Sequence, residues 1–231
     1  MRPLVNIVFE DQHFIAIDKP PGLMVHRSEL SRGVTEFALQ RVRDYLNSKV
    51  YTVHRLDRPT SGILIFAKDA GSTKALSAQF ARRTVTKKYV AVVRGFLPPV
   101  GRVEKKLERE PGQPPKAATT QWRVEGQWTF AEPTGRYETA RYSRLIVTPL
   151  TGRRHQIRRH FAHLRHPIIG DVRYGDRHHN HSLARFEALN RLMLHAEQLS
   201  FDHPSRNDRV TIVSSRPDAF SVERWPLPTT D

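Results

Sequence analysis

The run ILIFAKD, residues 63–69, constrains the fold of this chain more than any other feature. It is continuously apolar over five residues and short, which predicts a buried β-strand. Strands are also predicted at residues 4–10, 14–20, 87–96, 142–150 and 209–214. Helices are predicted at residues 35–46, 72–83 (with Ser72 as N-cap), 151–167 (ended by Pro167) and 183–194. Because strands and helices mix without regular βαβ alternation, the sequence predicts an α+β fold.

The middle of the chain, residues 97–135, is rich in proline, glycine and charge. This composition predicts a long excursion with short strands. No internal repeat or heptad pattern occurs, and 231 residues are compatible with one large domain or two small ones. We therefore expect a single catalytic domain over residues 1–231.

Composition limits the classes of function. The chain has no cysteine, which excludes disulfides, thiolate metal sites and a cysteine nucleophile. No apolar run approaches the length of a membrane span, and the charged N-terminal segment has no signal-peptide pattern, so a cytoplasmic protein is expected. Lysine and arginine number 38 against 23 acidic residues, a net charge of +15. Such an excess favours a polyanion partner, most commonly nucleic acid.

The stretch HRLDRPTSG, residues 54–62, places its single acid, Asp57, between Arg55 and Arg58. In a loop that contains proline, serine and glycine, an aspartate commonly bonds the amides of the turn. The alternative is a carboxylate that nearby guanidinium groups keep ionised for chemistry in a polyanion-binding cleft. The strand predicted directly after the loop would anchor it rigidly.

Residues 152–166, GRRHQIRRHFAHLRH, contain five arginines and four histidines but no acid. In a helix, Ile157 would lie on an apolar stripe, and Arg154, Arg158 and Arg165 would form a second stripe beside it. A row of planar guanidinium groups can bind phosphates or carboxylates through paired hydrogen bonds. A solvated basic face is the alternative, although such faces normally mix charges of both signs.

Two further features were considered as sites. The histidines at 160, 163 and 166 and those in HHNH, residues 178–181, have no cysteine or carboxylate partners at zinc-site spacing, so no metal site is predicted. Tyr89 lies in a predicted strand, where a tyrosine usually joins the core. Its functional alternative is to stack on a flipped base and transfer a proton.

Taken together, these segments resemble the RluA-type pseudouridine synthases. The resemblance covers five motifs in family order, at residues 18–26, 54–62, 87–95, 151–171 and 192–204. Among the branches of the family, these motif sequences are most similar to the branch that modifies uridine 65 of certain tRNAs. No counterpart of the small S4 RNA-binding domain of many relatives is expected.

The resemblance implies a long, mixed and mainly antiparallel sheet flanked by helices, with a central active-site cleft. It implies isomerisation of uridine to pseudouridine without a metal or organic cofactor. Asp57 matches the catalytic carboxylate, and Arg158 matches the arginine that pairs with it. Tyr89 matches the tyrosine that stacks on the base, and Arg55 matches a residue that fills the gap left by the flipped nucleotide. The resemblance also implies that Ile157 lines the uracil pocket.

Three alternatives stay open. A ribosomal RNA synthase of the same family would use nearly the same catalytic residues. A non-catalytic RNA-binding protein would use the basic surface alone, and a hydrolase or nuclease would use the histidines and Asp57. The favoured hypothesis has tRNA as substrate, no membrane association, no obligate protein partner and a monomeric state.

Overall fold

The computed structural model describes residues 5–27, 33–130, 133–134, 138–221 and 225. The chain divides into two compact units, each with its own hydrophobic core. Unit 1 consists of Met1–Lys87 and Ala196–Ser215, and unit 2 consists of Lys88–His195 and Arg216–Asp231. Both contain strands and helices in irregular order, which confirms the α+β class. None of the helices in the described ranges is long and apolar enough to cross a membrane.

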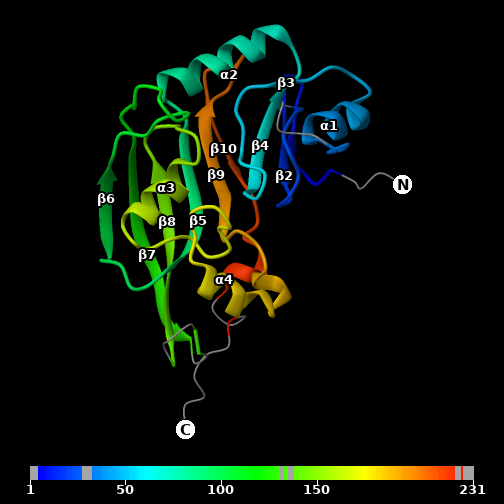
Figure 1. The fold of residues 1–231 in the computed structure, drawn as a ribbon. Coiled ribbons are helices and arrows are strands. Elements are labelled where there is room, and N and C mark those ends of the chain that lie inside the picture. The colour runs from blue at the N-terminus through cyan, green and yellow to red at the C-terminus, as the bar shows by residue number, and fades with distance from the viewer. Residues whose placement is uncertain (1–4, 28–32, 131–132, 135–137, 222–224, 226–231) are drawn as a thin grey trace. The chain divides into compact units, whose positions relative to one another are not determined.

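Unit 1 is built on a sheet in the strand order β1-β2-β4-β9, with β3 paired to β4 and β10 paired to β9 (Figure 1). All seven residues of β4 are buried, which confirms the strand predicted from the ILIFA run. Antiparallel pairing of β2 with β4 sets Lys19 opposite Gly62. The end of β2 therefore lies beside the start of β4. The strands are β1 (Ile7–Glu10), β2 (Phe14–Lys19), β3 (Tyr51–Thr52), β4 (Ser61–Ala67), β9 (Leu194–Asp202), whose first two residues belong to unit 2, and β10 (Arg209–Val213).

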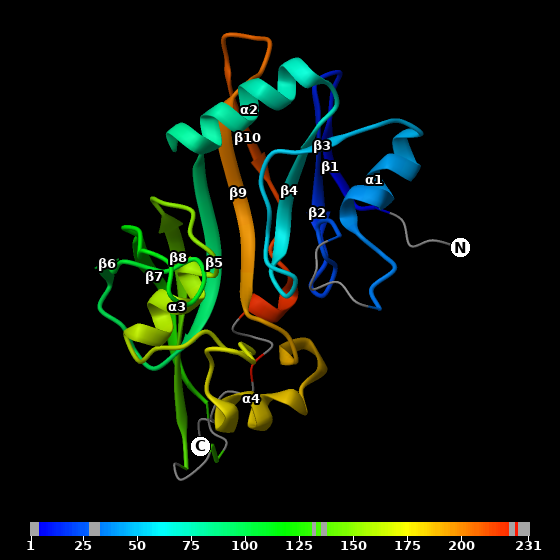
Figure 2. The ribbon, with the colours of Figure 1, turned by 45° about the horizontal axis from the view of Figure 1, so that its top comes forward.

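Two helices belong to unit 1, α1 (Ala38–Leu46) and α2 (Ala70–Arg82), and Figure 2 shows both beside its strands. The N-cap of α2 is Asp69, whose Oδ1 accepts a hydrogen bond from the backbone nitrogen of Ser72 at 2.8 Å. The prediction of Ser72 as the N-cap is therefore wrong. Both residue types are good caps, but the Asp69 carboxylate, three positions upstream, accepts from the Ser72 amide, which has no partner within the helix.

Unit 2 is built on an antiparallel sheet in the strand order β5-β8-β7-β6. Its strands are β5 (Thr86–Arg94), whose first two residues belong to unit 1, β6 (Val100–Glu104), β7 (Thr119–Phe130) and β8 (Ala140–Pro149). The prediction that residues 97–135 contain only short strands is wrong, because β7 alone spans twelve residues. Positions 131–132 and 135 of the predicted stretch lie outside the described residues. The register between β7 and β8 shifts between Val124 and Gly126, as at a β-bulge, and the two strands stay paired on both sides of the shift.

The arginine-rich helix of unit 2, α3 (Gln156–His163), is shorter at both ends than the predicted 151–167. Before it, Oε1 of Gln156 accepts from the hydroxyl of Thr151 at 2.6 Å and from the nitrogen of Arg153 at 3.0 Å, which folds that segment into a turn. After it, Arg165 adopts a left-handed conformation with φ 63°. The helix therefore ends before Pro167 is reached.

The helix predicted at 183–194 is wrong. Asp176 caps α4 (Arg177–Ala184) by accepting from the backbone nitrogens of His178 and His179, so the helix begins earlier. Residues 194–202 form β9 instead of continuing a helix. Two short 3₁₀ turns, Glu187–Leu189 and Asp218–Phe220, complete unit 2.

Candidate active site

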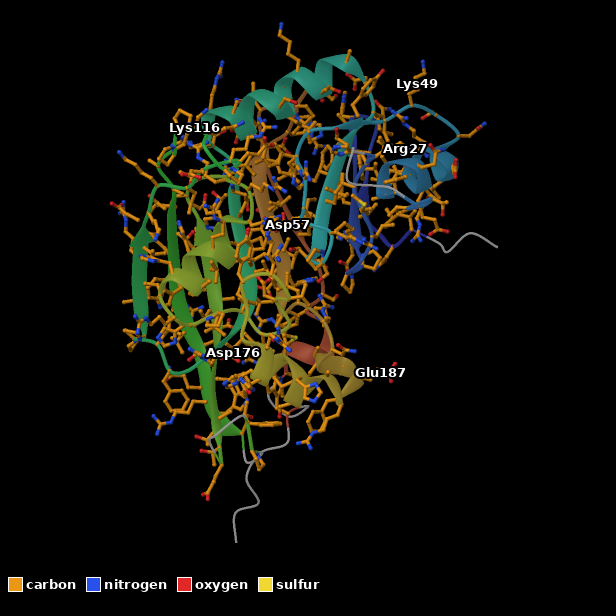
Figure 3. The ribbon with its side chains drawn as sticks, in the orientation of Figure 1. Arg27, Lys49, Asp57, Lys116, Asp176 and Glu187 are labelled. Carbon is orange, nitrogen blue, oxygen red and sulfur yellow. The ribbon has the colours of Figure 1, made fainter. Side chains whose placement is uncertain are left out.

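Asp57 lies on the loop of residues 53–60, between β3 and β4 of unit 1 (Figure 3). Its neighbour Leu56 is buried, and the backbone nitrogen of Thr60 donates to the carbonyl of Asp57 at 3.1 Å, closing a turn. Asp57 is half-buried, while Arg55 and Arg58 are exposed. The loop therefore holds a carboxylate at the surface of unit 1 on a fixed backbone.

The segment after β2 supports this loop directly. Lys19 is fully buried, and its Nζ donates to the carbonyls of Pro20, Leu23 and Arg58 at 2.8, 2.9 and 3.1 Å. Gly22 and Arg58 also exchange two hydrogen bonds, from the nitrogen of Gly22 at 2.9 Å and from Nε of Arg58 at 3.0 Å. The ammonium group thus ties the two motif loops together next to Asp57.

Replacement of Lys19 with methionine is expected to destabilise unit 1 by about 3 kcal/mol, because three buried carbonyls lose a charged donor. The midpoint of chemical denaturation measures this loss. Lys74 is exposed on α2, so Lys74→Met is the matched control and should change stability by less than about 0.5 kcal/mol. Equal midpoints for the two variants would contradict the role given to Lys19.

His54 fixes the other end of the loop. Its Nε2 accepts a hydrogen bond from the backbone nitrogen of Ile65 at 2.9 Å, and its ring stacks on Phe80 with 4.6 Å between ring centres. Burial, with a smaller contribution from the ammonium of Lys87, lowers the pKa of His54 to about 3. The imidazole is therefore neutral at physiological pH and acts as an acceptor for β4.

In unit 2, α3 carries a buried guanidinium. Arg158 is 4% exposed and donates from Nε to Oδ2 of Asp171 at 2.7 Å and from Nη2 to Oδ1 at 2.8 Å. The ring of Tyr174 lies 5.2 Å from Cζ of Arg158. We call this two-bond pair with the underlying ring the Arg158 fork. The two parallel, charge-assisted hydrogen bonds of this pair fix the orientation of the guanidinium group.

The carboxylate of the Arg158 fork is ionised. Burial opposes its ionisation, but the hydrogen bonds and the charge of Arg158 outweigh burial and hold the pKa of Asp171 below its ordinary value. The backbone nitrogens of Arg173 and Tyr174 also donate to Oδ1, at 2.9 and 3.0 Å. A carboxylate that accepts hydrogen bonds from this many donors stays ionised.

The remaining predicted residues of unit 2 fall into two groups. Tyr89 lies on β5 opposite Val147 of β8 and packs half-buried against the core of unit 2, and Ile157 is buried on α3. Arg154 and Arg165 are exposed and lie just outside the two ends of α3. The prediction that Arg154, Arg158 and Arg165 form one exposed row is therefore wrong, because α3 is short and Arg158 points into unit 2.

The histidines have structural partners. Within the residues that the structure describes, no three His, Cys, Asp or Glu side chains cluster as metal ligands would. The closest polar contacts are His160 with the Thr120 hydroxyl (2.9 Å), His163 with Lys105 (2.9 Å), His166 with the carbonyl of Arg94 (2.7 Å) and His179 with the Tyr142 hydroxyl (2.9 Å).

Comparison with known proteins identifies the family. A family model described as RNA pseudouridylate synthase matches residues 13–163, about two thirds of the chain. The chain belongs to the RNA pseudouridylate synthase family. This confirms the resemblance deduced from the five motifs.

Similar synthases of this family are known from several bacteria. "tRNA pseudouridine synthase C" of Haemophilus ducreyi is 42% identical over 96% of this chain and 93% of its own length. The protein of that name from Yersinia pestis is 41% identical over 91% of this chain and 86% of its own length. The solved structure of "Human RNA Pseudouridylate Synthase Domain Containing 1", 24% identical, superposes with a TM-score of 0.75 over 98% of this chain and 91% of that chain. That likeness confirms the fold.

Three residues of this pseudouridylate synthase chain escaped the sequence analysis. Lys19, Asp171 and Tyr174 all lie within or just beyond the motif segments, yet no function was assigned to them. A lysine directly before PPG and an aspartate directly after a glycine are the signals that the sequence offers. Neither signal reveals its partner, because Lys19 and Arg58 are 39 positions apart, and Arg158 and Asp171 are 13 apart.

Proposed function

We propose that this chain is a tRNA pseudouridine synthase that isomerises uridine to pseudouridine, at uridine 65. The observation that carries the proposal is the match of residues 13–163 to the family, with Asp57 inside it on a loop that Lys19 and His54 hold in place. Two relatives above 40% identity bear the name tRNA pseudouridine synthase C, which supports tRNA as the substrate.

The reaction rearranges one nucleoside. The bond from C1′ to N1 of uracil breaks, the ring turns, C5 bonds to C1′, and the proton on C5 leaves while N1 gains one. Asp57 is the catalytic carboxylate, acting either as a nucleophile at C1′ or as a base at C2′. Tyr89 stacks on the uracil and assists removal of the C5 proton.

The proposal requires Asp57 and Arg55 of unit 1 and Tyr89, Ile157 and Arg158 of unit 2 to act on the same nucleotide. A nucleotide in a stem must leave the stack to be reached, at a cost of a few kcal/mol. Arg55, exposed on the Asp57 loop, would fill the gap that remains. Ile157 would line the uracil pocket, and Arg158 would pair with Asp57.

The charge of the chain supports a polyanionic substrate. A net charge of +15 offsets the cost of base flipping through contacts with phosphates, and the exposed Arg154 and Arg165 are available for such contacts. The proposal includes a monomeric enzyme without a cofactor or an obligate partner, acting in the cytoplasm on folded tRNA.

Release of tritium from uridine C5 tests the proposal. Labelled tRNA transcripts are incubated with the protein in a buffer containing a chelator, and a second transcript carries cytidine at position 65. We expect release from the first transcript and none from the second. Release from ribosomal RNA alone would replace the tRNA assignment, cleaved RNA would favour a nuclease, and bound but fully labelled RNA would favour a non-catalytic RNA-binding protein.

A further inference from the structure

We propose that Asp171, together with Tyr174, is a positioning residue that fixes the guanidinium of Arg158 for catalysis. The inference rests on the proposed function, in which Arg158 pairs with the catalytic carboxylate. In this proposal Asp171 acts through Arg158 and does not contact the substrate.

The Arg158 fork holds the guanidinium by two bonds. An arginine side chain has several rotatable bonds, and one hydrogen bond would leave its plane free to turn. Two parallel bonds to Asp171, at 2.7 and 2.8 Å, fix both the position and the plane of the guanidinium. They engage Nε and Nη2, and the proposal assigns the edge at Nη1 to the carboxylate of Asp57.

Asp171 is itself immobilised. Its side chain accepts from the backbone nitrogens of Arg173 and Tyr174. Its carbonyl accepts from Nδ2 of Asn180 on α4 at 3.0 Å, and Oδ1 of the same asparagine accepts from the nitrogen of Gly170 at 2.8 Å. Asp171 is therefore fixed through its side chain to the turn that follows it and through its backbone to α4.

Tyr174 contacts both Arg158 and the start of the helix that carries it. The ring of Tyr174 lies 5.2 Å from Cζ of Arg158, which restrains tilting of the guanidinium plane and adds a cation–π attraction. The hydroxyl of Tyr174 lies 3.0 Å from Nδ1 of His155, the N-cap residue of α3. Ring, helix start and guanidinium thus restrain one another.

Stability alone does not account for an ionic pair at this place. Both side chains are almost fully buried, 5% exposed for Arg158 and 1% for Asp171. A buried ion pair seldom contributes more than well-packed apolar residues of the same volume, because two charges lose their hydration. What the pair supplies that apolar residues cannot is a guanidinium group held in one orientation.

Asp171→Asn tests the inference. Asparagine keeps the Oδ1 acceptor for the Arg173 and Tyr174 amides but loses the charge and one acceptor of the fork. We expect kcat for tritium release to fall by about 10- to 100-fold, because a misplacement near 1 Å has that effect on catalysis. KM should change by less than about twofold, since Asp171 is not expected to contact RNA.

Glu125→Gln is the matched control. Glu125 is another ion-paired acid of unit 2, although only half-buried, and its ion pair with Nη1 of Arg216 (2.8 Å) does not involve α3. The control is expected to lose stability but to keep kcat within about twofold of the wild type. Thermal melting of both variants shows that they are folded under the assay conditions.

A double mutant with Arg158→Lys completes the test. Lysine cannot form the fork, so adding Asp171→Asn to it should lower kcat by less than about threefold further. The inference is overturned if Asp171→Asn keeps the wild-type kcat, or if its kcat and KM effects match those of Glu125→Gln. Absence of tritium release by the wild-type enzyme would instead overturn the proposed function, which separates the two failures.

Discussion

Replacement of Asp57 with asparagine is expected to abolish pseudouridine formation while leaving tRNA binding intact. An amide can neither attack C1′ nor accept a proton from C2′, so the rate of tritium release should fall by at least about 10⁴-fold. The loop should survive, because asparagine has the same size and the bond from the Thr60 nitrogen ends on the backbone carbonyl of residue 57. Single-turnover tritium release measures the rate, and filter binding measures the dissociation constant for tRNA.

Asp208→Asn is the matched control for this variant. Asp208 is an exposed acid of the same unit, in the turn between β9 and β10, and it pairs with Arg206. Its rate should stay within about twofold of the wild-type rate. Tritium release by Asp57→Asn at a rate close to that of the control would disprove the assignment of Asp57, whatever the other motif residues do.

The strands of unit 1 were largely predictable because their signals are local. The apolar run at 63–67 and the short strands around it produce a sheet whose registers follow from which residues must be buried. β9 was missed and a helix was predicted up to residue 194, since both short apolar runs and helix patterns fit that region. The helix of this region begins earlier than predicted because Asp176 caps it at residue 177.

The candidate site was predictable at the level of motifs but not of partners. Asp57, Tyr89 and Arg158 were selected through the motifs that resemble the RluA-type synthases, because residue type alone left Tyr89 as a core residue and Arg158 as one of five arginines in its stretch. The prediction that Arg154, Arg158 and Arg165 lie on one helix face was wrong because it required a continuous helix. The side chain of Gln156 and the left-handed conformation of Arg165 shorten α3. The partner of Arg158 in unit 2, Asp171, follows the helix after a turn, and no periodic pattern in sequence relates the two.

The glycine that closes the Asp57 motif gives the largest expected effect on stability. Gly62 has φ +107°, and a Cβ added there would lie 2.3 Å from the carbonyl oxygen of Ala196 on β9. Gly62→Ala combines an unfavourable backbone conformation with a backbone clash, so we expect unfolding free energy to fall by about 3–5 kcal/mol. Because Asp57 lies five positions upstream, on the loop that leads into β4, tritium release should also fall.

Gly22→Ala separates the two causes. Gly22 also has a positive φ, +86°, but a Cβ there would meet nothing within 4 Å. It should therefore lose only the conformational part, about 1–2 kcal/mol. Urea denaturation of both variants gives the comparison through their midpoints. Close contact with β9 explains the glycine of the HRLDRPTSG motif only if Gly62→Ala is clearly the less stable of the two. Equal midpoints would leave backbone conformation as the whole reason for glycine at position 62.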